Sequence, residues 1–245
     1  MNLKKSLFTI IILIMLFTGC SNYQVQNKGI TLPDEATKQK TMTKVQNDID
    51  EIINKDYDYV LSNLGQPNAT AYWIDKNKID SLDTLDTLYD VEDLKDINLI
   101  YLKDISDENT NSTSLYLHLK DKIVKNAEIV DYSRFSTTKN MNKSKILIDC
   151  YTDGDVVKMS DLDMEKLENF TGANSSEMEK IVGNKQSSYD AYLYDKVEKS
   201  INVYNLDNED KLLAIFTEDN KISAIKILDN KKEVINEIKN IMIDN

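Results

Sequence analysis

The side chains that most often carry out catalysis are rare in this chain. Its 245 residues include one histidine and two cysteines. A catalytic acid or base usually titrates near neutral pH, as histidine does, so a Ser–His or Cys–His pair would have to include His118. His118 lies in the segment LYLHLK, on the strand face opposite three leucines, where we expect it to meet solvent. No HExxH, CxxC, GxSxG, GxGxxG or P-loop motif is present, so the sequence predicts a protein that is not an enzyme and holds no cofactor or metal.

Carboxylates are the other residues that could do chemistry, and they are concentrated in the segment 76–96. An EF-hand calcium loop needs acids at every second position, a central glycine and a terminal glutamate, and this segment has a spacing of three instead. A solvated acidic face is the simplest interpretation, and an acidic ridge that binds a partner is the functional one. The candidate partner-binding acids are Asp83, Asp86, Asp90 and Asp93. A cell-wall hydrolase that uses two carboxylates about 5–9 Å apart is a further alternative.

The same segment also places apolar residues at every third position. An α-helix has 3.6 residues per turn, so a spacing of three drifts by about 60° at each step and cannot stay on one face. We therefore expect two short helical turns, broken near 88–90 and folded against a sheet. The apolar positions are Ile79, Leu82, Leu85, Leu88, Val91, Leu94 and Ile97.

The N-terminus is typical of an export signal. Two lysines precede the apolar run Leu7 to Phe17, which is far shorter than the roughly 20 residues that span a bilayer. The sequence that follows, Thr18-Gly19-Cys20, resembles the lipobox of bacterial lipoproteins. The resemblance implies that the sulfur of Cys20 carries a diacylglycerol, with acyl chains such as palmitate, and that residues 1–19 are a signal peptide cleaved just before it.

The second cysteine, Cys150, lies in KILIDCY, where it alternates in phase with Ile146 and Ile148. We expect a buried thiol on the core face of a strand. Two alternatives remain at this point: a disulfide between Cys20 and Cys150, and an ordinary cleaved signal followed by an incidental cysteine.

The charge and composition indicate which partners and which kind of source organism the sequence favours. Removing residues 1–19 takes away two lysines and no acid, and so changes the net charge from −12 to −14. Nucleic-acid binding needs basic patches, so nucleic acid is excluded as a partner. The many Asn, Lys and Ile residues have AT-rich codons, which favours a low-GC, Gram-positive source. We expect residues 20–38 to be a tether that holds a soluble domain at the outer face of the cytoplasmic membrane.

The rest of the chain contains two similar stretches, which we assign to a first repeat (39–135, with the insertion 76–96) and a second repeat (136–245). Each stretch runs from a glycine-capped helix into an Ala-Tyr-x-x-Asp strand, an Ile-Asn strand and a hairpin. The chain ends with an amphipathic helix whose apolar residues should pack on the core. The predicted fold is α+β: two tandem units, each a helix pair plus an antiparallel sheet, followed by this C-terminal helix.

A family resemblance rests on Leu64-Gly65-Gln66-Pro67 followed by Tyr72-Trp73. These motifs are similar to those of the small assembly lipoproteins of the BamE/SmpA type, and two such units in tandem resemble the β-lactamase inhibitor protein fold. The likeness covers about 45–131 and 161–229. It implies a protein-binding or scaffold module without catalysis.

Aromatic residues gather on the equivalent strands of the two repeats. Most are expected in the core, and those that face outward would suit contact with a protein or a glycan. The candidates are Tyr72, Trp73, Tyr192 and Tyr194. The leading hypothesis is a membrane-anchored, non-catalytic protein-binding or scaffold lipoprotein with a protein partner at the cell surface. The alternative is a solute- or glycan-binding lipoprotein that serves a transporter, a sensor or a cell-wall or spore-envelope process.

Overall fold

The computed structural model describes residues 30–83, 96–102, 113–131, 145–152, 154–194, 197–208 and 210–243. Within these residues, no helix is long and apolar enough to cross a membrane. The helices are α2 (Glu35–Asn47), α3 (Tyr57–Leu64), α4 (Met164–Leu167), α5 (Glu179–Val182) and α6 (Lys231–Ile243), with 3₁₀ turns η1 (Ile49–Ile52), η2 (Lys76–Ser81), η5 (Met159–Asp161), η6 (Glu168–Phe170) and η7 (Ser175–Met178). The strands are β1 (Ala69–Asp75), β2 (Asp96–Leu102), β3 (Thr113–Lys120), β4 (Ile123–Asp131), β5 (Lys145–Tyr151), β6 (Val156–Val157), β7 (Tyr189–Tyr194), β8 (Glu198–Leu206), β9 (Leu212–Glu218) and β10 (Lys221–Leu228).

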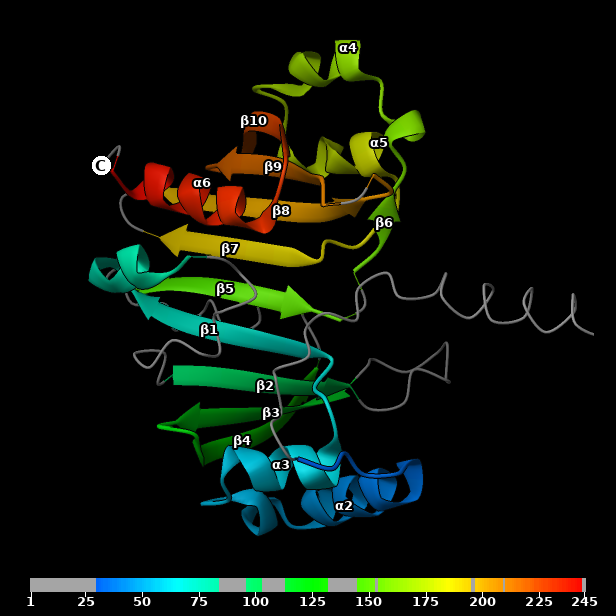
Figure 1. Ribbon diagram of the computed structural model, residues 1–245, viewed down its shortest axis with the longest axis vertical. Coiled ribbons are helices and arrows are strands. Elements are labelled where there is room, and N and C mark those ends of the chain that lie inside the picture. Colours follow the sequence, from blue (N-terminus) through cyan, green and yellow to red (C-terminus); the bar gives the residue numbers. More distant parts are fainter. Residues whose placement is uncertain are drawn as a thin grey trace, which may run out of the picture.

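All ten strands in the described part of the chain belong to one sheet. Its order is β10-β9-β8-β7-β5-β1-β2-β3-β4, and every neighbouring pair on this path is antiparallel, while the short β6 lies parallel to β8. Strand β5 lies in the middle, bonded to β1 on one side and to β7 on the other. Figure 1 shows the result, a tall twisted sheet with β1–β4 below β5 and β7–β10 above it.

The prediction of two tandem helix-pair-plus-sheet units is wrong. The segment KILIDCY, which lies within the second predicted repeat, is the central strand β5, and its backbone pairs with both halves. Without β5, β1 and β7 would each present an edge of unpaired backbone groups. Strand β5 pairs with both of these edges. Within its described residues, the second half also lacks a counterpart of the pair α2 and α3, because α4 and α5 are only four residues long.

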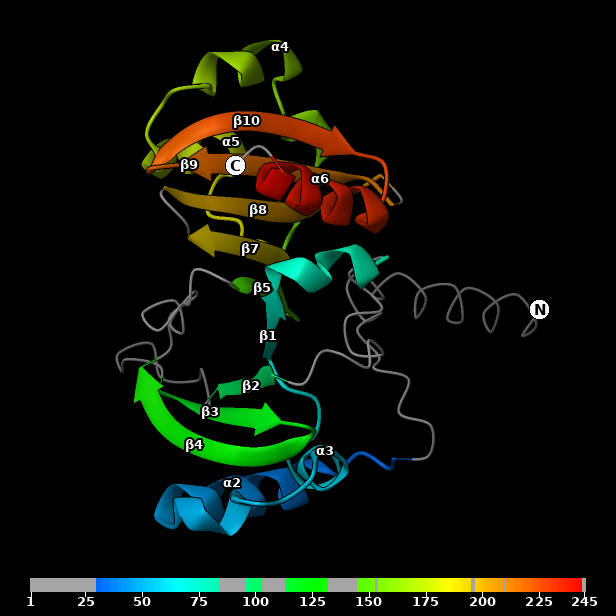
Figure 2. The same cartoon turned by 90° about the vertical axis from the view of Figure 1, so that its left-hand side faces the viewer.

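One face of the sheet, called here the first face, carries a single core along its whole length. Helices α2 and α3 cover it at the β1–β4 end, and α6 covers it at the β7–β10 end (Figures 1 and 2). Cys150 lies in this core with Ile146 and Ile148 and is 3% exposed, so its expected burial is confirmed. Helix α6 contributes Val234, Ile235 and Ile238, as its spacing predicted.

The opposite or second face has a smaller core at its β8–β10 end. The chain between β6 and β7 lies over this end and includes α4 and α5. Leu167 of α4 and Ile181 and Val182 of α5 pack there against Leu213 and Ile215 of β9. Strands β8, β9 and β10 are therefore packed on both faces, which accounts for the near-continuous burial of β9.

Local signals explain where the first helices begin and end. Asp56 precedes α3 and accepts a hydrogen bond of 2.7 Å from the backbone N–H of Tyr59, and Gly65 ends the helix at a φ of 76°. The Gly65 carbonyl accepts a 3.0 Å hydrogen bond from the hydroxyl of Tyr101 on β2. Burial raises the pKa of Tyr101 well above its usual value. The end of α3 is thus attached to the sheet by a neutral phenol.

The insertion begins with a helical turn folded against the core, as expected, but the turn is 3₁₀ rather than α. A 3₁₀ helix has 3.0 residues per turn, so residues three apart share a face and the drift of an α-helix does not arise. Accordingly, Ile79 and Leu82 are buried while Asp80 and Asp83 are exposed. Lys239 of α6 donates a 3.0 Å hydrogen bond to the carbonyl of Leu82. Residues 84–95, including the expected break, lie outside the described residues.

A single sheet predicts a single unfolding transition. We expect Ile148→Ala in β5 to lower the free energy of unfolding by about 2–5 kcal/mol, because it leaves a cavity in the shared core. Fluorescence of Trp73, the one tryptophan, reports on β1, and far-UV circular dichroism reports on the whole chain. In urea titrations both signals should shift together.

The matched control is Ile129→Ala on the edge strand β4, where the side chain is exposed and little stability should be lost. Two separate transitions, or a shift in the fluorescence signal alone, would show that the halves unfold independently.

Candidate functional site

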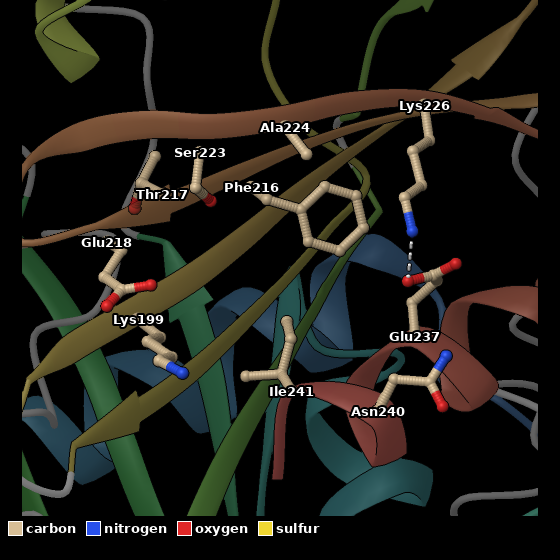
Figure 3. A pocket seen from close by; sticks show the side chains of 10 residues that line it. All are labelled: Lys199, Phe216, Thr217, Glu218, Ser223, Ala224, Lys226, Glu237, Asn240 and Ile241. Carbon is tan, nitrogen blue, oxygen red and sulfur yellow. Dashed lines mark hydrogen bonds and ion pairs between the residues drawn. The ribbon is translucent and has the colours of Figure 1, made fainter. Parts of the chain in front are cut away.

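A groove of about 450 Å³ lies on the first face between α6 and strands β8, β9 and β10 (Figure 3). Helix α6 begins three residues after the end of β10 and packs onto the first face through Val234, Ile235 and Ile238. The groove is the part of the first face beside the C-terminal half of α6. Its ten lining residues are Lys199, Phe216, Thr217, Glu218, Ser223, Ala224, Lys226, Glu237, Asn240 and Ile241.

One end of the groove is closed by an ion pair. Lys226 of β10 donates a 2.8 Å hydrogen bond to a carboxylate oxygen of Glu237 on α6. The same ammonium lies 5.2 Å from the centre of the Phe216 ring, within range of a cation–π interaction. The two side chains are 45% and 18% exposed, so solvent screens the pair and it contributes at most about 1 kcal/mol. Its main consequence is geometric, because it sets the distance between α6 and β10.

The other end of the groove carries two charges of opposite sign. Lys199 on β8 and Glu218 on β9 are cross-strand partners, and both line the groove on the first face. Neither forms an ion pair with any residue that the structure describes. Figure 3 shows them at the end opposite Lys226 and Glu237, with Phe216 and Ile241 between the two ends. The groove therefore combines an apolar middle with an ammonium and a carboxylate that are open to a ligand.

The second face carries a row of polar side chains across its central strands. The register places Asn202, Asp190 and Asp149 side by side on β8, β7 and β5. The row continues through Ala71 of β1 to Asn98 of β2. Asp149 and Asp190 are 3% and 1% exposed. Sequence reasoning missed this row, although the single acid within each of the apolar runs KILIDCY and YDAYLY was a usable signal.

Hydrogen bonds hold the two buried carboxylates. The amide of Asn202 donates to Asp190 over 2.7 Å, and the hydroxyl of Tyr151 donates to Asp149 over 3.1 Å. Such bonds offset part of the cost of burying a charge. No cluster of three or more His, Cys, Asp or Glu side chains suited to a metal occurs in the described part of the chain.

The row ends near His118, which is half-buried on β3. Its Nδ1 lies 2.9 Å from the amide oxygen of Asn98, so the ring donates to that oxygen if Nδ1 carries the proton. Its Nε2 lies 3.2 Å from Asp96 without hydrogen-bond geometry, which leaves an ion-pair contact when the ring is protonated. Asp96 also binds Lys145 at 2.6 Å. Among the described residues, no hydroxyl or thiol bonds to this ring.

The predicted aromatic candidates divide between the two faces. Tyr72 is 2% exposed and lies in the core of the first face, so it has no surface to offer a partner. Trp73 and Tyr192 lie on the second face, where each is the register partner of Leu147, and both are half-buried. Tyr194 ends β7, and its side chain is outside the described part.

Of the predicted acidic ridge, the described part contains only the first member. Asp83 is exposed, two residues after the end of η2. Asp86, Asp90 and Asp93 lie outside the described residues, as does the lipidation candidate Cys20. The structure therefore brings Trp73 and Tyr192 onto one face and leaves Asp83 apart from them. The sequence did not predict the groove beside α6.

Comparisons with protein-family models, with curated proteins and with solved structures find no match to this chain.

The polar row leads to a prediction about stability. Asn202→Ala removes the 2.7 Å donor to Asp190 and leaves that buried carboxylate with one hydrogen bond fewer. We expect the free energy of unfolding to fall by about 1–3 kcal/mol in urea titrations. Asn208→Ala, at an exposed position after β8, is the control and should change stability by less than about 0.5 kcal/mol. Equal effects of the two variants would contradict a structural role for the row.

Proposed function

We propose that this chain is a lipid-anchored, extracytoplasmic lipoprotein that acts as a non-catalytic protein-binding or scaffold module at the outer face of the cytoplasmic membrane. The observation that carries the proposal is the sequence Thr18-Gly19-Cys20 at the end of a short apolar run. One myristoyl-sized chain binds a membrane only marginally, and two acyl chains are enough for stable attachment. The tether is then shorter than the predicted residues 20–38, because α2 already begins at Glu35.

The contact surface that we assign to a protein partner is the acidic ridge of the insertion. Asp83 is exposed two residues after the end of η2, and η2 and its C-cap are held on the body by the burial of Ile79 and Leu82. Because η2 is packed on the core, the start of the acidic segment is held in place. This supports a role in recognition, since less conformational entropy is lost on binding. A basic surface on the partner would match these acids in charge.

A second candidate function is the binding of a small solute. It is favoured by the groove beside α6, whose volume of about 450 Å³ falls within the range of small-molecule sites. The described lining contains phenylalanine but no tyrosine or tryptophan. The composition of the groove therefore favours a charged solute over a glycan, which usually stacks on Trp and Tyr.

The anchoring is tested by Cys20→Ser with Cys150→Ala as the matched control. In cell fractionation we expect the unsubstituted chain and Cys150→Ala in the membrane fraction. Cys20→Ser should leave the membrane or keep its leader, because a serine hydroxyl forms no thioether. Mass spectrometry of the N-terminal peptide should find diacylglycerol on Cys20. A disulfide between Cys20 and Cys150, or an intact leader on the native chain, would overturn the proposed location.

The acidic ridge is tested by replacing Asp83, Asp86, Asp90 and Asp93 with asparagine together. These changes keep side-chain size and leave Ile79 and Leu82 in the core. Chemical cross-linking in cells should join the ridge of the unsubstituted chain to a membrane or wall protein, and high salt should weaken this contact. We expect the ridge variant to lose the cross-linked product. The charge-matched control also removes four acids, through Asp58→Asn, Asp161→Asn, Glu128→Gln and Glu165→Gln, all exposed on other elements. A partner retained by the ridge variant would remove the ridge from the proposal.

A further inference from the structure

We propose that the groove between α6 and strands β8–β10 binds a zwitterionic ligand of the amino-acid or dipeptide class that carries an apolar side chain. The inference rests on the second function proposed above, the binding of a small solute. It is independent of the lipid anchor and of the acidic ridge, because it depends only on residues that line the groove (Figure 3).

The two ends of the groove differ in how their charges are used. At one end, Lys226 and Glu237 neutralise each other at 2.8 Å. At the other end, Lys199 and Glu218 line the groove, and neither is in an ion pair within the described part of the chain. A ligand therefore meets one available ammonium and one available carboxylate. Lys199 and Glu218 are register partners on the neighbouring strands β8 and β9, so the backbones of these two residues are only about 5 Å apart.

This arrangement selects for both charges in one ligand. An anion would be attracted by Lys199 but repelled by Glu218. A cation would be attracted by Glu218 but repelled by Lys199. A free amino acid or dipeptide carries a carboxylate for Lys199 and an ammonium for Glu218. Each such contact, made near the surface, contributes modestly, so the two together are needed for binding.

The middle of the groove supplies the apolar part of the site. Phe216 is 5% exposed at the floor, and Ile241 of α6 stands opposite it (Figure 3). Burial of a ligand side chain against them would add about 25 cal/mol for each Å² of apolar surface removed from water. The amide of Asn240 and the hydroxyl of Ser223 are further lining groups that can bond to a peptide group.

The test uses the full chain in detergent micelles and the dipeptide Ala-Phe as the probe, followed by ligand-observed NMR titration. We expect saturable binding with a Kd on the order of 1 mM. Amidation of the carboxylate and acetylation of the ammonium should each weaken binding about three- to tenfold. Lys199→Gln should raise the Kd of Ala-Phe by a similar factor, but it should not further raise the Kd of the amidated peptide, which has already lost its carboxylate. Glu218→Gln should likewise raise the Kd of Ala-Phe but not that of the acetylated peptide.

Lys221→Gln and Glu198→Gln, at exposed positions of β10 and β8 outside the groove, are the charge-matched controls and should leave the Kd unchanged. Circular dichroism melts of each variant ensure that lost binding is not lost folding. The proposal would be overturned if binding does not saturate at tenfold higher peptide concentration, or if the peptide that is both amidated and acetylated binds equally well. It would also be overturned if a substitution and the matching peptide modification weaken binding additively. None of these results would bear on the attachment of Cys20 to lipid.

Discussion

The pairing of β5 with β1 and β7 is the constraint on which the rest of this structure depends. Both pairs are antiparallel, and the β1 pair runs along the whole of β5. Each half of the chain contributes a four-stranded meander that would otherwise end in an open edge. The central strand satisfies both edges, and it joins what would be two small cores into one core on the first face. A larger single core buries a greater fraction of its surface than two small ones would.

The polar row on the second face supports this central pairing by fixing its register. Asp149, Asp190 and Asn202 occupy matching positions on three adjacent strands. A slip by one residue would turn the two acids toward the apolar first face, at a cost of several kcal/mol for each buried charge. The row therefore disfavours wrong pairings more than it adds stability to the right one. With the register set, Lys199 and Glu218 come to lie next to each other on β8 and β9, where the groove opens.

The sequence predicted local structure well and long-range structure poorly. Alternating patterns identified the hairpin of β3 and β4 and that of β9 and β10, because side-chain alternation and turn residues act over a few positions. The role of KILIDCY was missed, since nothing within a strand specifies which distant strand will pair with it. The helical turn η2 was expected, but its 3₁₀ type was missed because a period of three was judged against α-helical geometry alone.

The candidate sites show the same division. The burial of Cys150 followed from its phase with two isoleucines, and the facing of Trp73 away from Tyr72 follows from alternation. The groove did not follow, because its lining comes from four elements whose arrangement depends on how α6 crosses the sheet. Charges that are distant in the sequence, such as Lys199 and Glu237, become neighbours of one cavity only after folding.

The position of α6 has a consequence for the order in which the chain can fold during its synthesis. Ile238 completes the first-face core, and Lys239 bonds to a carbonyl 157 residues earlier in the chain. A polypeptide that emerges from its amino end cannot close this core until α6 has been made. Until then the β7–β10 end of the first-face core stays uncovered, and an incompletely packed chain is what a translocation channel accepts. If the chain is exported as proposed, this late-closing topology favours passage before the core is complete.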